Sequence, residues 1–217
     1  SNKKTGTFGV MGTFSTFFSH HISTMEGGII ATDDKELYQI LLSLRAHGWT
    51  RDLPNNNLVC SKKDTESLKE DFRFVLPGYN VRPLELQGAI GIEQIKKLPM
   101  IISGRQKNAI LFKKILANHP DLMIQKEIGK SSWFGFSLII RPESKLDRAY
   151  LAKKLSSLGF EYRPIVTGNF ANNEVTKYFD SEVYGELKNA DYIDKNGVFI
   201  GNHHHTMSDA FLALGKI

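Results

Sequence analysis

The chain of 217 residues is long enough to bury a core as one large domain or two small ones. A hydrophobic fraction of 41% and a charged fraction of 24% are ordinary for a globular protein and exclude a disordered, collagen-like or coiled-coil chain. No apolar run approaches the roughly 18 residues that span a bilayer, and the first residues lack a signal-peptide pattern, so we expect no membrane partner. The net charge of +5 permits an anionic partner but is weak support for one.

Cys60 is the only cysteine, so the chain cannot form an internal disulfide, and this residue alone cannot hold an iron–sulfur cluster or a zinc ion. We therefore expect a reducing, cytoplasmic location. The opening Ser1-Asn2, without an initiator methionine, indicates an expression remnant on a fragment of a longer protein, with a processed mature terminus as the alternative.

The first part of the chain alternates strand and helix patterns. The apolar, aromatic stretch 8–18 predicts one or two buried strands, and the stretch 29–32 predicts a short strand. Asp33 followed by Glu36 predicts a helix start, and apolar residues recur at helical spacing until Gly48.

A long polar segment and two helices are predicted next. Residues 49–71 read as a loop of unusual length. Pro83 suits the first turn of a helix that ends at Pro99, and a second helix is predicted over 101–118.

The last part of the chain reads as a small α+β unit. Its predicted elements are strands over 122–125, 133–140, 160–165 and 198–200, a helix that Asp147 caps and Gly159 ends, and a last helix that opens at Ser208-Asp209. The early part resembles the end of an α/β layer, and the best division passes through the region 98–120.

The densest group of chemically active side chains lies at residues 15–21, and Glu26-Gly27-Gly28 follows it. The Ser15 hydroxyl and the glycine amides suit phosphate binding. The imidazoles of His20 and His21 suit proton transfer near neutral pH. A purely structural histidine pair is the alternative.

Two further motifs contain candidate binding residues. In Gly78-Tyr79-Asn80-Val81-Arg82, Asn80 either caps a helix or binds an anion together with Arg82. The alternative for Arg82 is an ordinary charged residue at the surface. The run His203-His204-His205 has neither the spacing of a helical metal pair nor that of a zinc finger, so we expect no metal.

In order and content these motifs resemble the DegT/DnrJ/EryC1/StrS family of sugar aminotransferases, fold-type-I enzymes that use pyridoxal phosphate. The resemblance runs from about Thr5 onward and rests on Ser15…His20, Glu26-Gly27-Gly28, His47-Gly48, Gly78-Tyr79-Asn80-Val81-Arg82 and Leu86-Gln87-Gly88-Ala89. It implies an α/β fold: the C-terminal part of a fold-type-I transferase. Residues 1–110 would be the truncated end of the large cofactor-binding domain, and residues 111–217 a small α+β domain.

One position departs from the aminotransferase pattern, because His20 stands where those enzymes carry the lysine that binds the cofactor covalently. The sequence His-His-Ile before Glu-Gly-Gly resembles the dehydratase branch, the nucleotide-4-keto-6-deoxyhexose 3-dehydratases. Some members of that branch carry a cysteine-ligated iron–sulfur cluster, and with Cys60 alone this chain resembles the cluster-free type. An imidazole cannot form the covalent link, so the cofactor would stay noncovalent as pyridoxamine phosphate. His20 would then serve as base and as acid in expelling the C3 hydroxyl of the sugar.

The resemblance also implies roles for the other site residues. Ser15 would bind the cofactor phosphate, and Asn80 would reach the cofactor phosphate of the neighbouring subunit in a homodimer. Arg82 would support that loop, and His21 would orient His20 or pack. The family's aspartate on the pyridinium nitrogen lies upstream of Ser15, outside this chain. We therefore expect the fragment to bind cofactor weakly or not at all, to be inactive by itself, and to expose an apolar sheet surface.

The resulting expectation is a cytoplasmic lyase of deoxysugar and lipopolysaccharide biosynthesis that dehydrates a nucleotide sugar. One alternative is an aminotransferase or pseudo-enzyme of the same family in which another amine does the work. The other is a nonenzymatic basic binding module, supported only by the charge of +5; we expect no nucleic-acid partner. The sequence leaves open whether the nucleotide is GDP or CDP, the sugar stereochemistry and the amino donor.

Overall fold

The computed structural model describes residues 3–217, so the expected expression remnant, Ser1-Asn2, lies outside the described residues. The chain divides into two compact units, Ser1–Lys97 and Leu98–Ile217. The assignment of residues 1–110 to a cofactor domain and 111–217 to a small domain stays a prediction. Within the described part of the chain, no helix is both long and apolar enough to cross a membrane.

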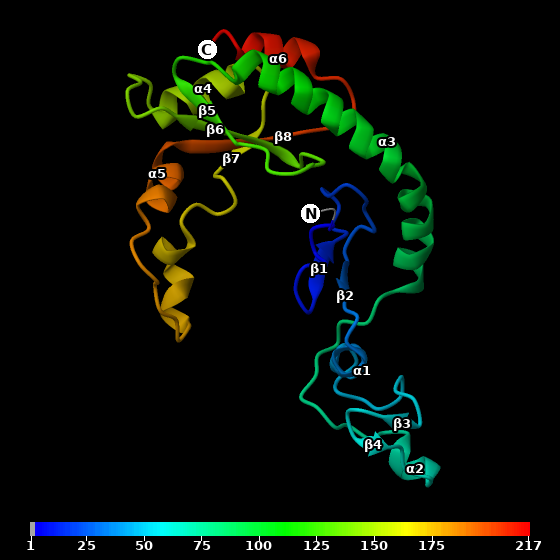
Figure 1. Cartoon of the computed structure of the whole chain (residues 1–217). Coiled ribbons are helices and arrows are strands. Elements are labelled where there is room, and N and C mark those ends of the chain that lie inside the picture. The colour runs from blue at the N-terminus through cyan, green and yellow to red at the C-terminus, as the bar shows by residue number, and fades with distance from the viewer. Residues whose placement is uncertain (1–2) are drawn as a thin grey trace. The chain divides into compact units, whose positions relative to one another are not determined.

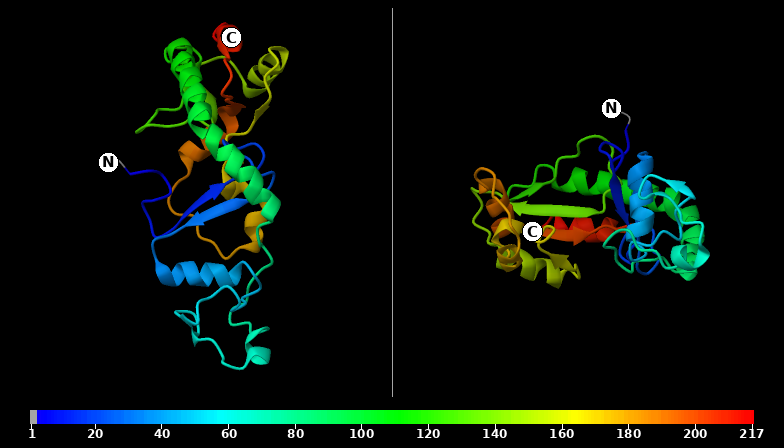
Figure 2. Two further views of the ribbon diagram at one scale, coloured as in Figure 1. Left: turned by 90° about the vertical axis from the view of Figure 1, so that its right-hand side faces the viewer. Right: turned by 90° about the horizontal axis from the view of Figure 1, so that it is seen from below.

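The first unit begins with a hairpin of two antiparallel strands, β1 (Gly12–Ser15) and β2 (Gly28–Ala31), which lie side by side in Figures 1 and 2. Helix α1 (Lys35–Leu44) follows. The Asp34 carboxylate accepts a hydrogen bond from the Leu37 amide at 3.0 Å, so the helix is capped one residue later than the predicted Asp33.

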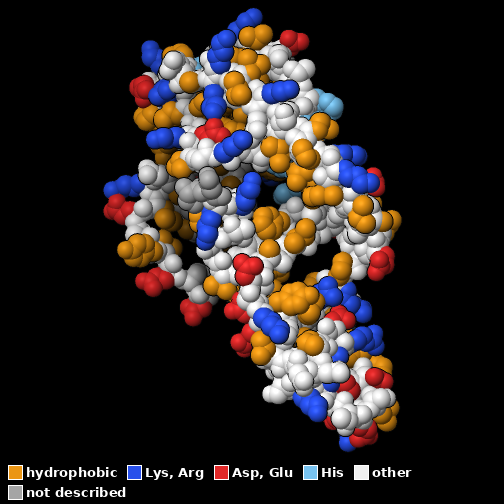
Figure 3. Space-filling view, turned by 45° about the vertical axis from the view of Figure 1, so that its right-hand side comes forward, with side chains coloured by type: hydrophobic (Ala, Val, Ile, Leu, Met, Phe, Trp, Pro, Cys, Tyr) orange, Lys and Arg blue, Asp and Glu red, His pale blue; other side chains and the backbone are white. Residues whose placement is uncertain are grey.

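The expected burial of residues 8–18 is wrong for much of this stretch, although part of it does form a strand. Phe8, Val10 and Phe14 expose 60%, 65% and 43% of their surfaces, and Ile29 and Ile30 of β2 are half exposed. Figure 3 shows many apolar side chains at the surface among the lysines and arginines. The expected apolar surface on this sheet is therefore present.

Residues 49–71 are not the structureless loop that their polarity predicts. They contain a two-residue strand pair, β3 (Asn56–Asn57) and β4 (Ser61–Lys62), and a short helix, α2 (Ser67–Glu70). The Asn57 side-chain oxygen accepts from the amides of Val59 and Cys60 at 3.0 and 2.8 Å, and these bonds shape the turn.

Helix α3 (Glu85–Leu116) runs without interruption through Pro99, so the predicted end at Pro99 and the separate second helix are wrong. Proline in a helix interior lacks an amide donor and costs about 3 kcal/mol. Beyond the proline, α3 buries side chains at helical spacing from Ile101 to Leu116, and this packing offsets that cost. The helix begins two residues after Pro83.

The second unit contains a four-stranded antiparallel sheet with the order β5-β6-β8-β7. Its strands are β5 (Leu122–Ile124), β6 (Gly135–Ile140), β7 (Tyr162–Arg163) and β8 (Gly197–Gly201). Its helices are α4 (Arg148–Ser157), α5 (Lys188–Asn196) and α6 (Ser208–Leu214), with the 3₁₀ turns η1 (Phe170–Asn172) and η2 (Glu174–Tyr178).

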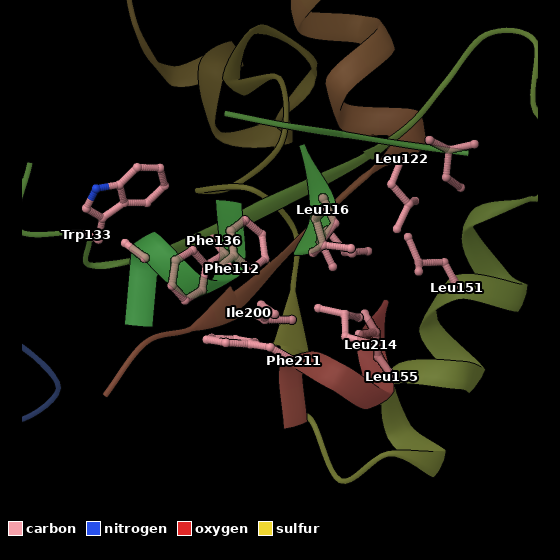
Figure 4. Close-up of a cluster of buried hydrophobic side chains, with 14 residues drawn as sticks. Phe112, Leu116, Leu122, Trp133, Phe136, Leu151, Leu155, Ile200, Phe211 and Leu214 are labelled. Atoms are coloured by element: carbon pink, nitrogen blue, oxygen red, sulfur yellow. The ribbon is translucent and has the colours of Figure 1, made fainter. Parts of the chain in front are cut away.

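Every predicted strand of this unit is present in part, and Asp147 caps α4 as predicted by accepting from the Tyr150 amide at 2.7 Å. The elements of this unit that the sequence did not predict are α5 and the 3₁₀ turns η1 and η2. The apolar face of the sheet packs against α4, α6 and the end of α3, as the close-up in Figure 4 shows.

The core of the second unit is aromatic and aliphatic. Phe112 of α3 stacks on Phe136 of β6 with ring centroids 4.1 Å apart, and Phe211 of α6 meets both rings edge-on. All three side chains are fully buried. Interlocked aromatic rings of this size dominate the stability of a small core.

We predict that Phe112→Ala lowers the free energy of unfolding of the second unit by about 3–5 kcal/mol, because it removes a buried ring and leaves a cavity. Ile110→Ala, in the same helix but 65% exposed, is the matched control and should cost far less. Urea denaturation followed by tryptophan fluorescence compares the two. Equal losses for both variants would contradict this assignment of the core.

A cluster of hydrogen bonds and one ion pair around Glu127 holds the loop that follows β5 in place. The Glu127 carboxylate pairs with the Lys113 ammonium at 2.7 Å and accepts from the Ser131 amide and the Trp133 indole, both at 3.0 Å. The hydrogen bond from Lys113, followed by that from the Ser131 amide, lowers the pKa of Glu127 to about 2. The ionised form is therefore the one that the folded state stabilises.

This lowered pKa predicts a pH-dependent contribution to stability. It is complete above the ordinary pKa of 4.5 and is lost as the pH falls through about 2, because the folded state binds the proton less readily than the unfolded state. The difference in urea midpoint between the wild type and Glu127→Gln should therefore shrink between pH 6 and pH 2. Glu143→Gln, at an exposed position, is the control and should give no such trend.

Candidate functional site

The candidate catalytic residues lie at and just after the end of strand β1. Ser15 is the last residue of β1 and pairs with Gly28, the first residue of β2. The intervening loop is closed by backbone hydrogen bonds, from the Thr16 amide to the Gly27 carbonyl at 3.0 Å and from the Thr24 amide to the Thr16 carbonyl at 2.8 Å. The strand pairing therefore fixes both ends of the segment that holds the two histidines.

The structure brings Ser15 and His20 together. The Ser15 hydroxyl oxygen lies 3.5 Å from Nδ1 of His20, and it accepts a hydrogen bond from the Phe17 amide at 3.2 Å. The His20 amide donates to the Phe17 carbonyl at 2.9 Å, which turns the chain back toward the strand. Ser15 is exposed and His20 is half-buried, so both are accessible to a ligand. His21 is also half-buried, and its role stays a prediction.

The Gly-Tyr-Asn-x-Arg motif is fixed against the end of α1. The Tyr79 amide donates to the Leu44 carbonyl at 2.8 Å, and the His47 amide donates to the Tyr79 carbonyl at 2.8 Å. Gly48, with φ +83°, supplies the backbone conformation at the turn, and a side chain there would collide with the Leu76 carbonyl. This ladder holds the segment that presents Asn80.

Asn80 and Arg82 contact each other. Nε of Arg82 donates to the side-chain oxygen of Asn80 at 3.2 Å, and both side chains are exposed. Asn80 does not cap α3, which begins at Glu85. An amide and a guanidinium held side by side offer several donors to an anion.

Gln87 belongs to the motif Leu86-Gln87-Gly88-Ala89, and the sequence alone assigns it no role. In the structure its side-chain oxygen accepts from the Leu84 amide at 2.8 Å, at the start of α3. Its side-chain nitrogen donates to the Glu26 carbonyl at 2.7 Å. Gln87 therefore ties the start of α3 to the Glu-Gly-Gly turn. A glutamine in the first turn of a predicted helix is typical of a residue that caps the helix start, and this position was the signal in the sequence for that role.

The three histidines at 203–205 lie in the loop after β8, whose backbone Asn108 holds by donating to the carbonyls of His203 and His205 at 2.7 Å. One nitrogen from each ring falls within 4.8 Å of the others. Two of the ring pairs stack and the His204–His205 pair is tilted, with centroids 4.2–4.6 Å apart. Nδ1 of His203 accepts from the His205 amide, and burial, followed by the charges of His204, His205 and Arg105, lowers the pKa of His203. The absence of a metal site stays a prediction.

Comparisons with known proteins agree with the motif reading. The model of the DegT/DnrJ/EryC1/StrS aminotransferase family matches residues 1–213. The GDP-4-keto-6-deoxy-D-mannose 3-dehydratases of Yersinia pseudotuberculosis and Escherichia coli O55:H7 are 58% and 59% identical to the chain, over 100% and 96% of its length. The chain spans about half of these relatives, 56% and 54% of their lengths.

Solved structures give the same result. The E. coli GDP-4-keto-6-deoxy-D-mannose-3-dehydratase with bound hydrated PLP matches with a TM-score of 0.95 and 57% identity, over 99% of this chain and 56% of that chain. The Helicobacter pylori aminotransferase PseC, at 22% identity, shares the fold with a TM-score of 0.77 over 99% of this chain and 54% of that chain. The expected fold class, part of a fold-type-I PLP-dependent transferase, is confirmed. The chain belongs to the DegT/DnrJ/EryC1/StrS aminotransferase family.

Proposed function

We propose that this chain is part of an enzyme that removes the C3 hydroxyl of a GDP-linked 4-keto-6-deoxyhexose in deoxysugar biosynthesis. The observation that carries the proposal is the contact between Ser15 and His20. It accords with the motif resemblance, in which His20 stands at the position of the aminotransferase lysine. Support for the GDP sugar comes from two relatives at 58% and 59% identity, both named for that substrate. A solved relative also holds GDP-perosamine. A nucleotide-sugar substrate accords with a cytoplasmic enzyme.

The donors in the first unit suit the phosphate of pyridoxamine or pyridoxal phosphate. Ser15 offers an exposed hydroxyl, and Asn80 and Arg82 offer an exposed amide and guanidinium. Hydroxyl, amide and guanidinium donors are the groups that bind phosphate oxygens best. When bound, the cofactor would supply a pyridine ring that takes up the electrons left when its own C4′ carbon loses a proton. One solved relative contains hydrated PLP and another contains PLP with glutamate, which supports this cofactor class.

His20 provides the proton transfer in this proposal. Its imidazole cannot make the covalent link that a lysine makes, and it can instead accept a proton and return it to the leaving hydroxyl. Nδ1 of the ring faces the Ser15 hydroxyl. Ser15 thus orients the ring as well as binding phosphate. His21 orients His20 or packs in the loop.

We propose further that the enzyme is a homodimer in which Asn80 reaches the cofactor phosphate of the other subunit. The segment around Asn80 suits contact with a second chain, because Tyr79, Val81 and Leu84 expose 73%, 67% and 65% of their surfaces. The side chain of Arg82 holds Asn80 at the tip of this segment.

We predict that His20→Asn lowers the dehydration rate by about 10²–10⁴-fold, because an amide cannot move a proton as an imidazole does. The assay uses GDP-4-keto-6-deoxy-D-mannose and a protein of the relatives' full length that carries this chain. His205→Asn, in the second unit, is the matched control and should keep the rate. A full rate in His20→Asn would show that the role given to His20 is wrong. A cofactor that borohydride fixes to the wild type would favour an aminotransferase.

A mixing experiment tests the position of Asn80. Full-length Asn80→Ala and His20→Asn homodimers should each be nearly inactive, but mixed dimers should regain activity. In such a dimer one site has His20 from one subunit and Asn80 from the other, so about a quarter of all sites would be intact after random exchange. No recovery, with exchange of subunits verified by mass spectrometry, would place Asn80 in the same site as its own His20.

A further inference from the structure

Two threonines close the loop that holds His20. The Thr16 and Thr24 hydroxyl oxygens are 2.7 Å apart, and the residues are only 5% and 8% exposed. The Thr24 hydroxyl also donates to the Glu26 carbonyl at 2.8 Å. The Thr24 hydroxyl also lies 3.4 Å from the Thr16 carbonyl, and either hydroxyl can be the donor between the two threonines. The pair is therefore joined to the backbone on both sides of the loop.

The same carbonyl receives a second donor from α3. The Gln87 side-chain nitrogen donates to the Glu26 carbonyl at 2.7 Å, while its oxygen accepts from the Leu84 amide. The chain thus runs from Thr16 through Thr24 to Glu26 and meets Gln87 there, and each named group has a partner. Satisfied polar networks with little exposure fix one geometry, because breaking any link leaves a donor or acceptor unpaired.

Gly27 is the residue that makes room for this pair. A side chain on it would lie 2.7 Å from the Thr16 hydroxyl oxygen and 2.8 Å from that of Thr24, and its φ is +142°. Only glycine accommodates both the close approach and this backbone conformation. The first glycine of Glu-Gly-Gly is therefore needed to make room for the threonine pair. This role differs from the phosphate binding that the sequence suggested for the glycine amides.

We propose that Thr16, Thr24 and Gln87 are positioning residues that hold His20 against Ser15. The threonine hydroxyls join the two ends of the segment 17–23, and His20 lies in its middle. Thr16 also follows Ser15 directly, so a displacement of the pair moves both members of the contact. The proposal rests on the proposed function for its kinetic consequence, whereas the effect on the loop itself can be measured without any substrate.

Three variants separate the hydroxyl from the bulk of the side chain. Thr24→Val removes the hydroxyl and keeps the methyl that packs near Gly91. Thr24→Ser keeps the hydroxyl and removes the methyl. Thr65→Val, at an exposed position away from the loop, is the matched control. If Thr24→Val does not fold, Thr16→Val replaces it, because Thr24 then keeps its donor bond to Glu26.

The experiment measures hydrogen exchange and kinetics on the full-length protein. In Thr24→Val the amides of Phe17 and His20 should exchange about tenfold faster, while amides of β8 are unchanged. With GDP-4-keto-6-deoxy-D-mannose, kcat should fall by about tenfold or more with little change in KM, and the pH profile of kcat should shift. Thr24→Ser should stay within about twofold of the wild type, and Thr65→Val should match it.

Two results would overturn the proposal. Unchanged exchange at Phe17 and His20 would show that the threonine pair does not hold the loop. Faster exchange with an unchanged kcat and pH profile would show that the pair is only structural. A wild type that does not dehydrate the substrate would contradict the proposed function instead, and the exchange measurement would still decide whether the pair holds His20 in place.

Discussion

The pairing of β1 with β2 is the constraint on which the site depends. Ser15 and Gly28 face each other across the hairpin, so the intervening segment must return to its starting point within a short length of chain. That return brings the imidazole of His20 to the hydroxyl of Ser15. A shift of the register by one residue would turn Ser15 to the other face of the hairpin and separate the two groups. The proton transfer proposed for His20 therefore depends on the pairing of these two strands.

Much of the site could be read from the sequence, because its residues belong to short motifs whose order is itself informative. Ser15, His20 and the Glu-Gly-Gly turn lie close together along the chain, so the sequence itself indicates that they lie close together in space. The bond from Arg82 to Asn80 is also local. The link from Gln87 to Glu26 could not be predicted, because the two residues lie 61 positions apart and no pattern in a single sequence shows that contact. The threonine pair could not be predicted either, because nothing in the sequence shows that two hydroxyls eight positions apart lie 2.7 Å from each other.

The errors in the fold have similar physical causes. Local rules predict that a helix ends at Pro99, whereas the packing of the following turns of α3 overrides the local cost of the proline. The polarity of residues 49–71 predicts a loop, yet the side chain of Asn57 supplies the hydrogen bonds that build a small hairpin there. Local rules succeeded where a cap decides the boundary, as at Asp147. They failed at Pro99, where contacts distant in sequence decide where the helix ends, and at residues 49–71, where polarity alone does not indicate the turn that Asn57 forms.

The two units are stabilised by different interactions, and this difference bears on the chemistry. Among the described residues of the first unit, Ala46 and Leu53 are the buried hydrophobic ones, whereas the second unit has a continuous aromatic and aliphatic core. In the described chain, hydrogen bonds among Thr16, Thr24 and Glu26 order the segment that holds His20. Because each such bond contributes only about 1 kcal/mol, local opening of this segment is easier than unfolding of the second unit. A shared network in which Thr24 and Gln87 meet at one carbonyl raises the cost of opening, since the links are lost together.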